Sequence, residues 1–301
     1  MYLGSRLALV FLWLIHWLPL SALAFIGVSL GKLLYRLAHS RRHIARRNIE
    51  LCFPEKTPQE QEKIVREHFE FLVRSVLERS LIFYASPKRL KKLIHIEGDP
   101  NYAEKHLQQR FTWLIPHFVG LDMAATAISI YQNRLGVSIY QEQSNPIMDK
   151  AAYTARTRFN SGLLFSRQQG LVPVIKAIRR ENAVLATLPD QDFGLQDAEF
   201  VPFFGIPAAT LTSTSRIAHS MNMQILPVIV QMLPGGQGYR VHFIPPLENI
   251  PTKDAYADTV KINAFLEEQI RLYPAQYLWV HRRFKTRPLG EDSVYNELTP
   301  P

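Results

Sequence analysis

The apolar residues of the chain are concentrated in one long N-terminal run. Positions 7–34 read LALVFLWLIHWLPLSALAFIGVSLGKLL, with no acidic residue and a single formal charge. A continuous helix of that length would extend about 40 Å, beyond the roughly 30 Å hydrocarbon core of a bilayer. Pro19 and Gly27 permit a kink, and Trp13 and Trp17 suit the membrane–water interface. The run predicts a membrane-anchoring helix at the N-terminus.

Two other interpretations of this run stay open. SALA at 21–24 resembles a signal-peptide cleavage site, although the apolar run continues past it into a basic stretch, which export disfavours. His16 and Pro19 also permit a pair of shorter helices that lies in the membrane interface. The sequence therefore predicts a membrane location without deciding between a spanning and an interfacial anchor.

Six basic residues and no acidic residue occupy positions 32–47, at the end of the apolar run and directly after it. Positive charge next to a membrane segment holds the following chain in the cytoplasm and attracts anionic lipids. We expect residues 1–38 to form the anchor with its basic flank, and residues 39–301 to form a cytoplasmic α/β domain.

Strand-like and helix-like apolar patterns alternate through the rest of the chain. Short apolar runs predict strands at 111–116, 136–140, 183–189, 224–230 and 239–245. One helical pattern begins at Thr57, before the first of these strands. Others lie at 119–133, 148–160, 172–181, 209–221 and 255–273. This alternation predicts an α/β fold with a mostly parallel central sheet covered by helices on both faces. PGGQG at 234–238 predicts a hairpin, which makes the last strand antiparallel.

Composition narrows the class of protein. The chain has 301 residues, 47% hydrophobic and 20% charged, which fits an ordered protein with one large core or two small ones. Its single cysteine, Cys52, excludes an intramolecular disulfide and a cysteine-based zinc cluster. The net charge of +9 indicates an anionic partner. Because basic residues flank the apolar run, anionic lipid fits better than nucleic acid.

The stretch LIPHFVGLD at 114–122 contains the first candidate for chemistry, the pair His117 and Asp122. Inside one helix five residues turn by about 500°, so the two side chains would lie roughly 140° apart. They can meet if His117 ends a strand, Gly120 lets the chain turn, and Asp122 lies in the first turn of the next helix. Asp122 could then accept a hydrogen bond from Nδ1, leaving Nε2 at the carboxyl ends of the strands.

Such a pair would act as a general base with its orienting carboxylate. No G-x-S-x-G nucleophile elbow occurs, so the nucleophile would be a hydroxyl of the substrate. Neither a G-x-G-x-x-G nor a Walker A loop is present, which disfavours a dinucleotide or P-loop site. On these residues alone a buried imidazole near a helix start is the open alternative.

A second candidate is LPDQDFG at 188–194, where Asp190 and Asp192 follow a predicted strand. A D-x-D sequence could bind a divalent metal together with a nucleotide sugar, as in a glycosyltransferase. The same residues could equally form an Asx turn closed by Gly194.

A third candidate is basic. Arg156, Arg158 and Arg167 could recognise phosphate, although such runs also occur as solvated helix faces. The apolar stretch FVPFFGIPAAT at 200–210 reads, on its own, as core.

These segments together resemble the lipid A biosynthesis late acyltransferases of the lauroyl/myristoyl type. That family lies within the glycerophosphate/lysophospholipid acyltransferase superfamily, which has an H-x4-D/E motif. HFVGLD matches the motif, and the N-terminal anchor and four other segments agree in order and spacing: NPIMDK…RTRF, LPDQDFG, FVPFFGIPAAT and PAQYLWVHRRFKTRP. The resemblance covers essentially the whole chain. The family more often has Glu at the position of Asp122.

The resemblance implies transfer of an acyl chain from acyl carrier protein to a hydroxyl of a 3-hydroxyacyl chain on a Kdo-bearing lipid A precursor. His117 would be the general base and Asp122 its orienting carboxylate. Arg158 is the first choice and Arg167 the second for the substrate phosphate. The remaining residues that the resemblance singles out are two site-ordering carboxylates, Asp190 and Asp192, and two residues that either line the acyl channel or pack in the core, Phe203 and Phe204.

The resemblance also implies partners and a location. We expect acyl carrier protein, the lipid A precursor and anionic inner-membrane lipids as partners, no nucleic acid, and no metal or cofactor beyond the acyl donor. The expected location is the bacterial inner membrane, with the catalytic domain on the cytoplasmic side. Two alternatives are a metal-dependent glycosyltransferase that uses Asp190 and Asp192, and a non-catalytic membrane-tethered binding protein.

Overall fold

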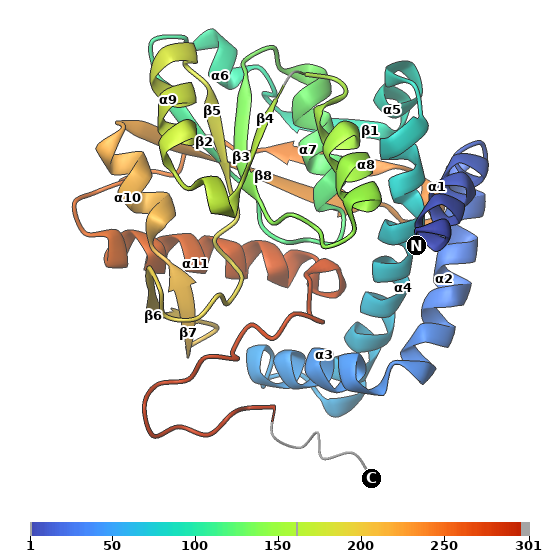
Figure 1. The fold of residues 1–301 in the computed structure, drawn as a ribbon. Coiled ribbons are helices and arrows are strands. Elements are labelled where there is room, and N and C mark those ends of the chain that lie inside the picture. Colours follow the sequence, from blue (N-terminus) through green and yellow to red (C-terminus); the bar gives the residue numbers. More distant parts are fainter. Residues whose placement is uncertain (1, 161, 296–301) are drawn as a thin grey trace.

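The computed structural model describes residues 2–160 and 162–295 (Figure 1). They form a seven-stranded sheet in the order β1-β9-β8-β2-β5-β3-β4 and a separate hairpin, β6-β7. The strands of the large sheet are β1 (Ile94–Gly98), β2 (Arg110–Leu114), β3 (Gly136–Tyr140), β4 (Leu163–Ser166), β5 (Val184–Thr187), β8 (Met223–Met232) and β9 (Tyr239–Phe243). Neighbouring strands are parallel except β8 and β9. The predicted α/β fold with a mostly parallel sheet is confirmed, and so is the antiparallel last strand.

The sequence patterns missed two strands of the large sheet and the small hairpin. β1 and β4 are the edge strands of the sheet, and each is short, with five and four residues. The hairpin strands β6 (Ala198–Phe203) and β7 (Ile206–Leu211) are joined by Phe204 and Gly205, whose φ angles are 50° and 75°. Two positive φ values in succession make a tight hairpin turn. The helix expected over 209–221 therefore begins later, as α10 (Ser213–Ser220).

Helices connect the strands and pack against them. Four predicted helices form close to where they were expected: α7 (Leu121–Tyr131), α8 (Pro146–Thr157), α9 (Val172–Glu181) and α11 (Ala255–Leu272). The long α4 (Pro58–Tyr84) begins with a capping box between Thr57 and Glu60. The shorter elements are α3 (His39–Cys52), α5 (Pro87–Leu93), α6 (Tyr102–Lys105), η1 (Arg167–Gln169), η2 (Pro234–Gly236) and η3 (Pro274–Gln276).

The N-terminal apolar run forms two helices, which corrects the expectation of one. α1 (Leu3–Ile15) and α2 (Leu20–Leu37) are separated at residues 16–19. Pro19 directly precedes α2, where a residue without an N–H does not interrupt helical hydrogen bonds. By length and composition α2 could cross a membrane, whereas α1 is too short. In Figure 1, α2 runs beside α4, which it contacts.

The order of the central strands determines where the candidate residues meet. β2 and β5 are parallel neighbours, so their carboxyl ends lie at the same edge of the sheet. His117 follows β2 and Asp190 follows β5. Two segments 73 positions apart in the sequence are thereby brought into contact.

Candidate active site

His117 lies in the irregular segment between β2 and α7, where the C-terminal part of the chain pairs with it. The backbone N–H of Val119 donates to the carbonyl of Gln276 at 2.8 Å, and that of Leu278 donates to the carbonyl of His117 at 3.0 Å. The side chain of Gln276 in turn bonds both backbone groups of Met232 on β8. The backbone around His117 is thus held between the sheet and the C-terminal segment.

Asp190 binds His117 at two points. Its Oδ1 lies 2.7 Å from the ring Nδ1, and its Oδ2 accepts the backbone N–H of His117 at 2.8 Å. The side chain of Asp190 is fully buried, whereas that of His117 keeps 17% of its surface exposed. With Nδ1 directed at the carboxylate, Nε2 has no hydrogen bond to any residue that the structure describes. This nitrogen is available to a ligand.

The structure differs from the expected contact between His117 and Asp122. The chain turns at Gly120 and Asp122 lies in the first turn of α7, as predicted. The Asp122 carboxylate, however, forms ion pairs with Arg79 on α4, at 2.8 Å, and Arg156 on α8, at 3.1 Å. These two positive charges hold the Asp122 carboxylate on the side of α7 that faces α4 and α8. The catalytic role of Asp122 stays a prediction.

Both carboxylates are held in the ionised form. Burial alone would raise the pKa of Asp190, but the positive charge of His117, its two hydrogen bonds and Arg283 outweigh burial and lower that pKa. Burial would likewise raise the pKa of Asp122, and the charges and hydrogen bonds of Arg79 and Arg156 lower it. Asp190 can therefore stabilise an imidazolium at His117.

A narrow recess opens beside His117, and the segment after α11 forms much of its wall. Its lining residues are Asn48, His117, Asp190, Gln191, Tyr277, Leu278, Trp279, His281 and Arg283. Asn48 on α3 fixes this wall, because its Nδ2 donates to the carbonyls of Trp279 and His281 at 2.7 and 2.8 Å. The hydroxyl of Tyr277 donates to the backbone carbonyl of Asp190 at 3.2 Å.

Asp192 fastens the same wall from the other side. Its carboxylate accepts hydrogen bonds from the backbone N–H and the hydroxyl of Thr286, at 2.7 and 2.8 Å. It also accepts the N–H of Gly194 at 2.9 Å, which is the Asx turn considered from the sequence. The backbone N–H of Asp192 donates to Nε2 of His281 at 3.0 Å.

His281 can accept that hydrogen bond because its ring stays neutral. Burial, followed by the positive charges of Arg283 and His117, lowers the pKa of His281 to about 4. Within residues 2–160 and 162–295, no group of three or more His, Cys, Asp or Glu side chains is arranged to hold a metal. Asp190 and Asp192 are bonded to protein groups and act here as parts of the site's framework.

The two arginines expected to bind substrate lie in different surroundings. Arg158 donates through Nη1 and Nη2 to the carbonyls of Ile82 and Ala85 at the end of α4, at 2.7 and 2.9 Å. It satisfies backbone groups that the helix leaves without partners. Arg167 is exposed, and its guanidinium lies 4.6 Å from the centre of the Phe193 ring. A substrate-binding role for either arginine stays a prediction.

Phe203 and Phe204 lie in the turn region of the small hairpin. Phe203 is fully buried, with its ring centre 6.1 Å from that of Tyr277 and 5.0 Å from the guanidinium carbon of Arg283. Phe204 is partly buried, and its backbone N–H donates to Glu267 at 2.7 Å. Core packing accounts for both positions, and their role in an acyl channel stays a prediction.

Several site residues were not singled out from the sequence. They are Arg79, which pairs with Asp122, and four residues of the recess wall, Tyr277, Trp279, His281 and Arg283. The available signal was PAQYLWVHRRF, where aromatic residues, a histidine and two arginines gather in a segment with no helical or strand period. Arg79 offered no signal, because it is one of many charged residues on α4.

Comparisons with known proteins agree with this architecture. A family model described as bacterial lipid A biosynthesis acyltransferase matches residues 1–286. The chain is 32% identical to a lipid A biosynthesis lauroyltransferase of Escherichia coli (strain K12), over 94% of this chain and 92% of the relative. It is 31% identical to the palmitoleoyltransferase of that organism over the same shares. A myristoyltransferase from the same strain is 27% identical over 93% of this chain and 89% of its own length.

The fold is α/β, and the recess at His117, the candidate site, lies at the carboxyl edge of its sheet. The chain belongs to the bacterial lipid A biosynthesis acyltransferase family, and it is an acyltransferase. The resemblance read from the sequence motifs is thereby confirmed.

Proposed function

We propose that this acyltransferase transfers an acyl chain from acyl carrier protein to a hydroxyl of a 3-hydroxyacyl chain on a Kdo-bearing lipid A precursor. The observation that carries the proposal is the geometry of His117. Its Nδ1 is bonded to a buried carboxylate while its Nε2 keeps no protein partner among the described residues. A histidine with one nitrogen fixed and the other free is suited to general base catalysis.

The proposed reaction needs no nucleophile from the protein. Nε2 of His117 takes the proton of the acceptor hydroxyl, and the hydroxyl oxygen attacks the carbonyl carbon of the thioester. As the ester C–O bond forms, the C–S bond breaks, and the imidazolium gives its proton to the departing thiolate, which leaves as the thiol of the carrier. In this scheme Asp190 holds the ring and stabilises the imidazolium, a task that the sequence motif alone gave to Asp122.

Arg79 and Arg156 are suited to bind the phosphate of the acceptor. Their side chains are 48% and 38% exposed, although both pair with Asp122. The two arginines carry one positive charge more than this carboxylate neutralises. A partly exposed guanidinium held in a fixed orientation can bind phosphate through two N–H groups. Arg167, exposed on the η1 turn, is a further cation for the lipid or for acidic acyl carrier protein.

The proposed location is the inner membrane, with the site in the cytoplasm. The apolar α2 and the basic residues that follow it support membrane attachment. The relatives from Escherichia coli are named as lipid A biosynthesis enzymes. A lipid acceptor with several acyl chains remains in the bilayer, so an attached enzyme can reach it without extracting it.

Purified full-length enzyme tests the proposal directly. Acyl transfer from acyl carrier protein to the Kdo-bearing precursor is measured for the wild type, His117→Ala and the control His219→Ala, which changes an exposed histidine on α10. We expect His117→Ala to lose at least about 10³-fold of the rate and the control to retain it. Full activity in folded His117→Ala would overturn the mechanism. Mass spectrometry of lipid A from cells with and without the gene then identifies the added acyl group.

A further inference from the structure

α2 lies so close to α4 that their backbones are in contact at two glycines. A Cβ atom at Gly27 would come within 2.8 Å of the Cα of Arg74, and one at Gly31 within 2.5 Å of the Cα of Glu70. Gly27 and Gly31 are one helical turn apart and lie on the same face of α2. This face is therefore fully occupied by α4.

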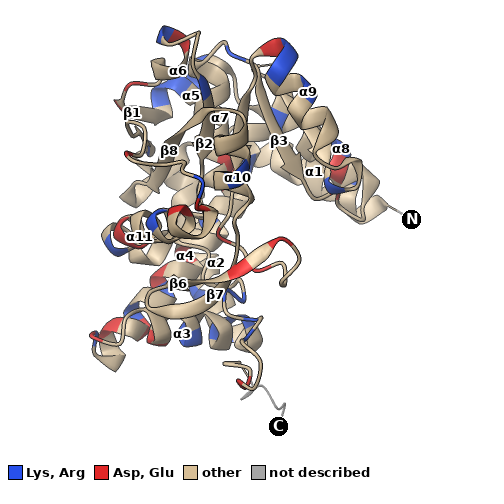
Figure 2. Ribbon diagram, turned by 90° about the vertical axis from the view of Figure 1, so that its left-hand side faces the viewer, with Lys and Arg blue, Asp and Glu red and all other residues tan. Residues whose placement is uncertain are grey.

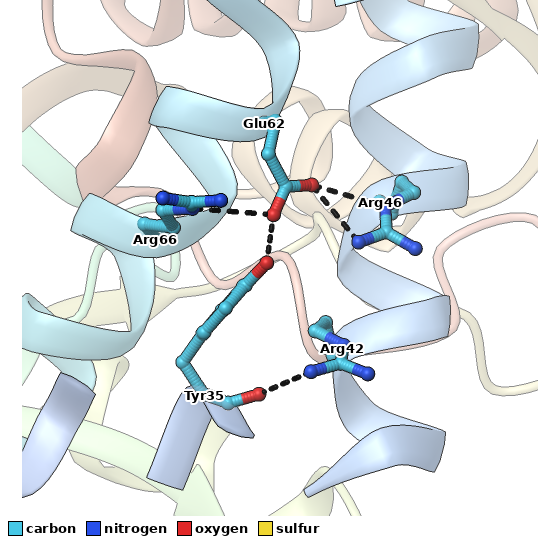
Figure 3. A network of polar contacts seen from close by, with 5 residues as sticks. All are labelled: Tyr35, Arg42, Arg46, Glu62 and Arg66. Carbon is cyan, nitrogen blue, oxygen red and sulfur yellow. Dashed lines mark hydrogen bonds and ion pairs between the residues drawn. The ribbon is translucent and has the colours of Figure 1, made fainter. Parts of the chain in front are cut away.

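Polar contacts continue the attachment to the far end of α2. The hydroxyl of Tyr35 donates to the carboxylate of Glu62 on α4 (Figure 3). Arg46 on α3 donates to the same carboxylate through Nε and Nη2, at 3.1 and 2.9 Å. At the other end, the backbone of Leu20 and Ser21 touches Gly236. α2 therefore contacts the rest of the protein from its first turn to its last.

α4 carries charged side chains that oppose its crossing a bilayer beside α2. It carries a buried ion pair between Arg74 and Glu78 and exposed charges that include Lys63 and Arg66. Charged side chains are costly in hydrocarbon, and they are rare in membrane segments unless they face a protein interior. Because α2 and α4 run side by side, a spanning α2 would place Glu70, which lies against Gly31, and the Arg74–Glu78 pair, which lies beside Gly27, near the depth of the bilayer core.

The faces of α1 and α2 that point away from the domain are largely apolar, with Arg6, Lys32 and Arg36 as their exposed charges. The large exposed side chains on α1 are Leu3, Leu7, Val10, Phe11, Trp13 and Leu14, those on α2 are Phe25, Ile26, Leu30, Leu33, Leu34 and Leu37, and Trp17 lies in the turn between the helices. Contiguous exposed apolar surface of this extent indicates a membrane or protein contact. α1, with 13 residues, is about 20 Å long and too short to span.

Positive charge surrounds this apolar surface. The first 49 residues contain no acidic side chain. The basic helix α5 lies beside the turn between α1 and α2, because Arg89 donates to the carbonyls of His16 and Leu18. Lys88, Lys91 and Lys92 on α5 are exposed, and Figure 2 shows the basic positions of this helix in blue. Apolar side chains with tryptophan, next to a basic rim, suit a leaflet that contains anionic lipids.

We propose that α1 and α2 form a monotopic pair that lies in one leaflet of the membrane, with α5 against the anionic headgroups. Neither helix spans the bilayer. The N-terminus and the catalytic domain are then on the same side of the membrane. The acceptor lipid reaches the enzyme from the leaflet into which the pair is inserted.

Depth measurements on the full chain test this proposal. Single cysteines replace Ile26, Leu30 and Leu37, which share one face of α2, in a Cys52→Ala background. Each carries a fluorophore, and lipids labelled at different acyl depths quench it in phosphatidylethanolamine–phosphatidylglycerol vesicles. We expect three shallow and similar depths. In a spanning helix Ile26 and Leu37 would differ by about 16 Å along the membrane normal. A depth gradient of that kind, or no quenching at any position, would overturn the proposal.

Sidedness and charge provide two independent checks. Gly4→Cys, where a Cβ meets no atom within 4 Å, and the domain reference Glu248→Cys are treated with an impermeant maleimide in inverted membrane vesicles and in spheroplasts. Because the proposal puts both positions on the same side of the membrane, both cysteines should react in the same preparation. Labelling of Gly4→Cys in one preparation and of Glu248→Cys in the other would contradict the proposal. Lys91→Gln combined with Lys92→Gln should lower partitioning into anionic vesicles about 30-fold, at about 1 kcal/mol for each lysine, and Lys176→Gln on α9 should leave it unchanged. Equal partitioning of all three proteins would contradict the role of α5.

Discussion

The carboxylate of Asp190 holds His117 by its ring and by its backbone, with Nδ1 at 2.7 Å from one oxygen and the backbone N–H at 2.8 Å from the other. Each contact restricts a different motion. The first fixes the ring orientation and the proton on Nδ1, and the second fixes the segment that carries the ring. Because Asp190 is fully buried and follows the neighbouring strand β5, the sheet itself positions the proposed base.

Asp190→Asn should abolish most activity while leaving the fold intact. An amide can present its NH2 group to Nδ1, which favours the tautomer with the proton on Nε2 and so removes the base. We expect kcat to fall about 10³–10⁴-fold, the size of the effect known for the same change in a catalytic triad, with little change in KM for the lipid. Steady-state acyl transfer from acyl carrier protein measures both constants.

The matched control for Asp190→Asn is Asp197→Asn, which alters an exposed aspartate whose ion pair is with Arg216 at 3.6 Å. It should retain wild-type kcat. If Asp190→Asn kept kcat within a few-fold of wild type, the orienting role of this carboxylate would be wrong.

Asp122 should influence the reaction by positioning Arg79 and Arg156, and not by orienting His117. We expect Asp122→Asn and Arg156→Gln each to lower kcat/KM at least about ten-fold, and the double variant to be no worse than the poorer single variant, because both remove the same ion pair. Asp122→Asn combined with Asp190→Asn should instead show multiplied losses. A double-mutant cycle on kcat/KM makes the comparison. Multiplied losses for Asp122 and Arg156 would contradict this account.

Substitution of Arg158 should mainly lower the stability of the protein, whereas substitution of Arg156 should mainly lower its activity. Arg158 donates to the carbonyls of Ile82 and Ala85, so Arg158→Ala should cost about 1–3 kcal/mol of unfolding free energy by leaving these acceptors without a partner. Arg156→Ala should lower activity with a loss below about 1 kcal/mol, since its pair with Asp122 is 38% exposed on the arginine side. Urea unfolding in detergent and acyl-transfer rates give the two readouts. Equal stability losses would show that Arg158 is not a structural residue of this kind.

The central strands and most helices could be predicted from the pattern of apolar residues. Buried side chains recur along each of these elements with the spacing of a strand or a helix, so the sequence alone shows the element. β2, β3, β5, β8 and β9 were predicted for this reason. The edge strands β1 and β4 are as short as β3 and β5, but as edge strands their residues are mostly exposed or only partly buried, so neither forms a continuous buried apolar run. The break between α1 and α2 falls at Pro19, a residue the sequence already marked. The close packing of α2 against α4 is a long-range contact, which hydropathy does not describe.

The site was predictable only as far as local geometry reaches. The predicted strand, glycine turn and helix start placed Asp122 correctly in the first turn of α7 and His117 close to the end of β2, although His117 lies in the irregular segment after the strand. Which carboxylate meets Nδ1 depends on β5 lying next to β2 and on the C-terminal segment that pairs with residues 117–119. Both are long-range contacts, and an H-x4-D spacing contains no information about them.

The enzyme should lose stability between neutral pH and pH 5 because of His68. Its Nδ1 bonds the carbonyl of Ala275, and its Nε2 is buried without a partner among the described residues. Burial lowers the pKa of His68 to about 4, from about 6.5 in the unfolded chain. The unfolded chain therefore binds the proton first, and stability falls as pH drops through this window. Between pH 7.5 and 5 the loss from His68 is about 2 kcal/mol.

Urea unfolding at the two pH values measures the effect of His68. His68→Gln can keep a hydrogen bond to Ala275 and has no proton to take up in this range. The variant should lose about 2 kcal/mol less than the wild type between pH 7.5 and 5. An unchanged pH dependence would assign the acid lability to other groups.

Gly31→Ala should destabilise the protein although alanine is the better helix former. A methyl group at this position meets the Cα of Glu70 at 2.5 Å, and backbone cannot move aside as a flexible side chain can. We expect a net loss of about 1–3 kcal/mol from overpacking, against the roughly 1 kcal/mol that alanine gains over glycine inside a helix. The matched control is Gly4→Ala on α1, where a Cβ has open space, and which should be neutral or stabilising. Thermal unfolding in detergent compares the two. If Gly31→Ala were as stable as Gly4→Ala, α2 would not be pressed against α4, and the packing that keeps α2 out of the bilayer core would be absent.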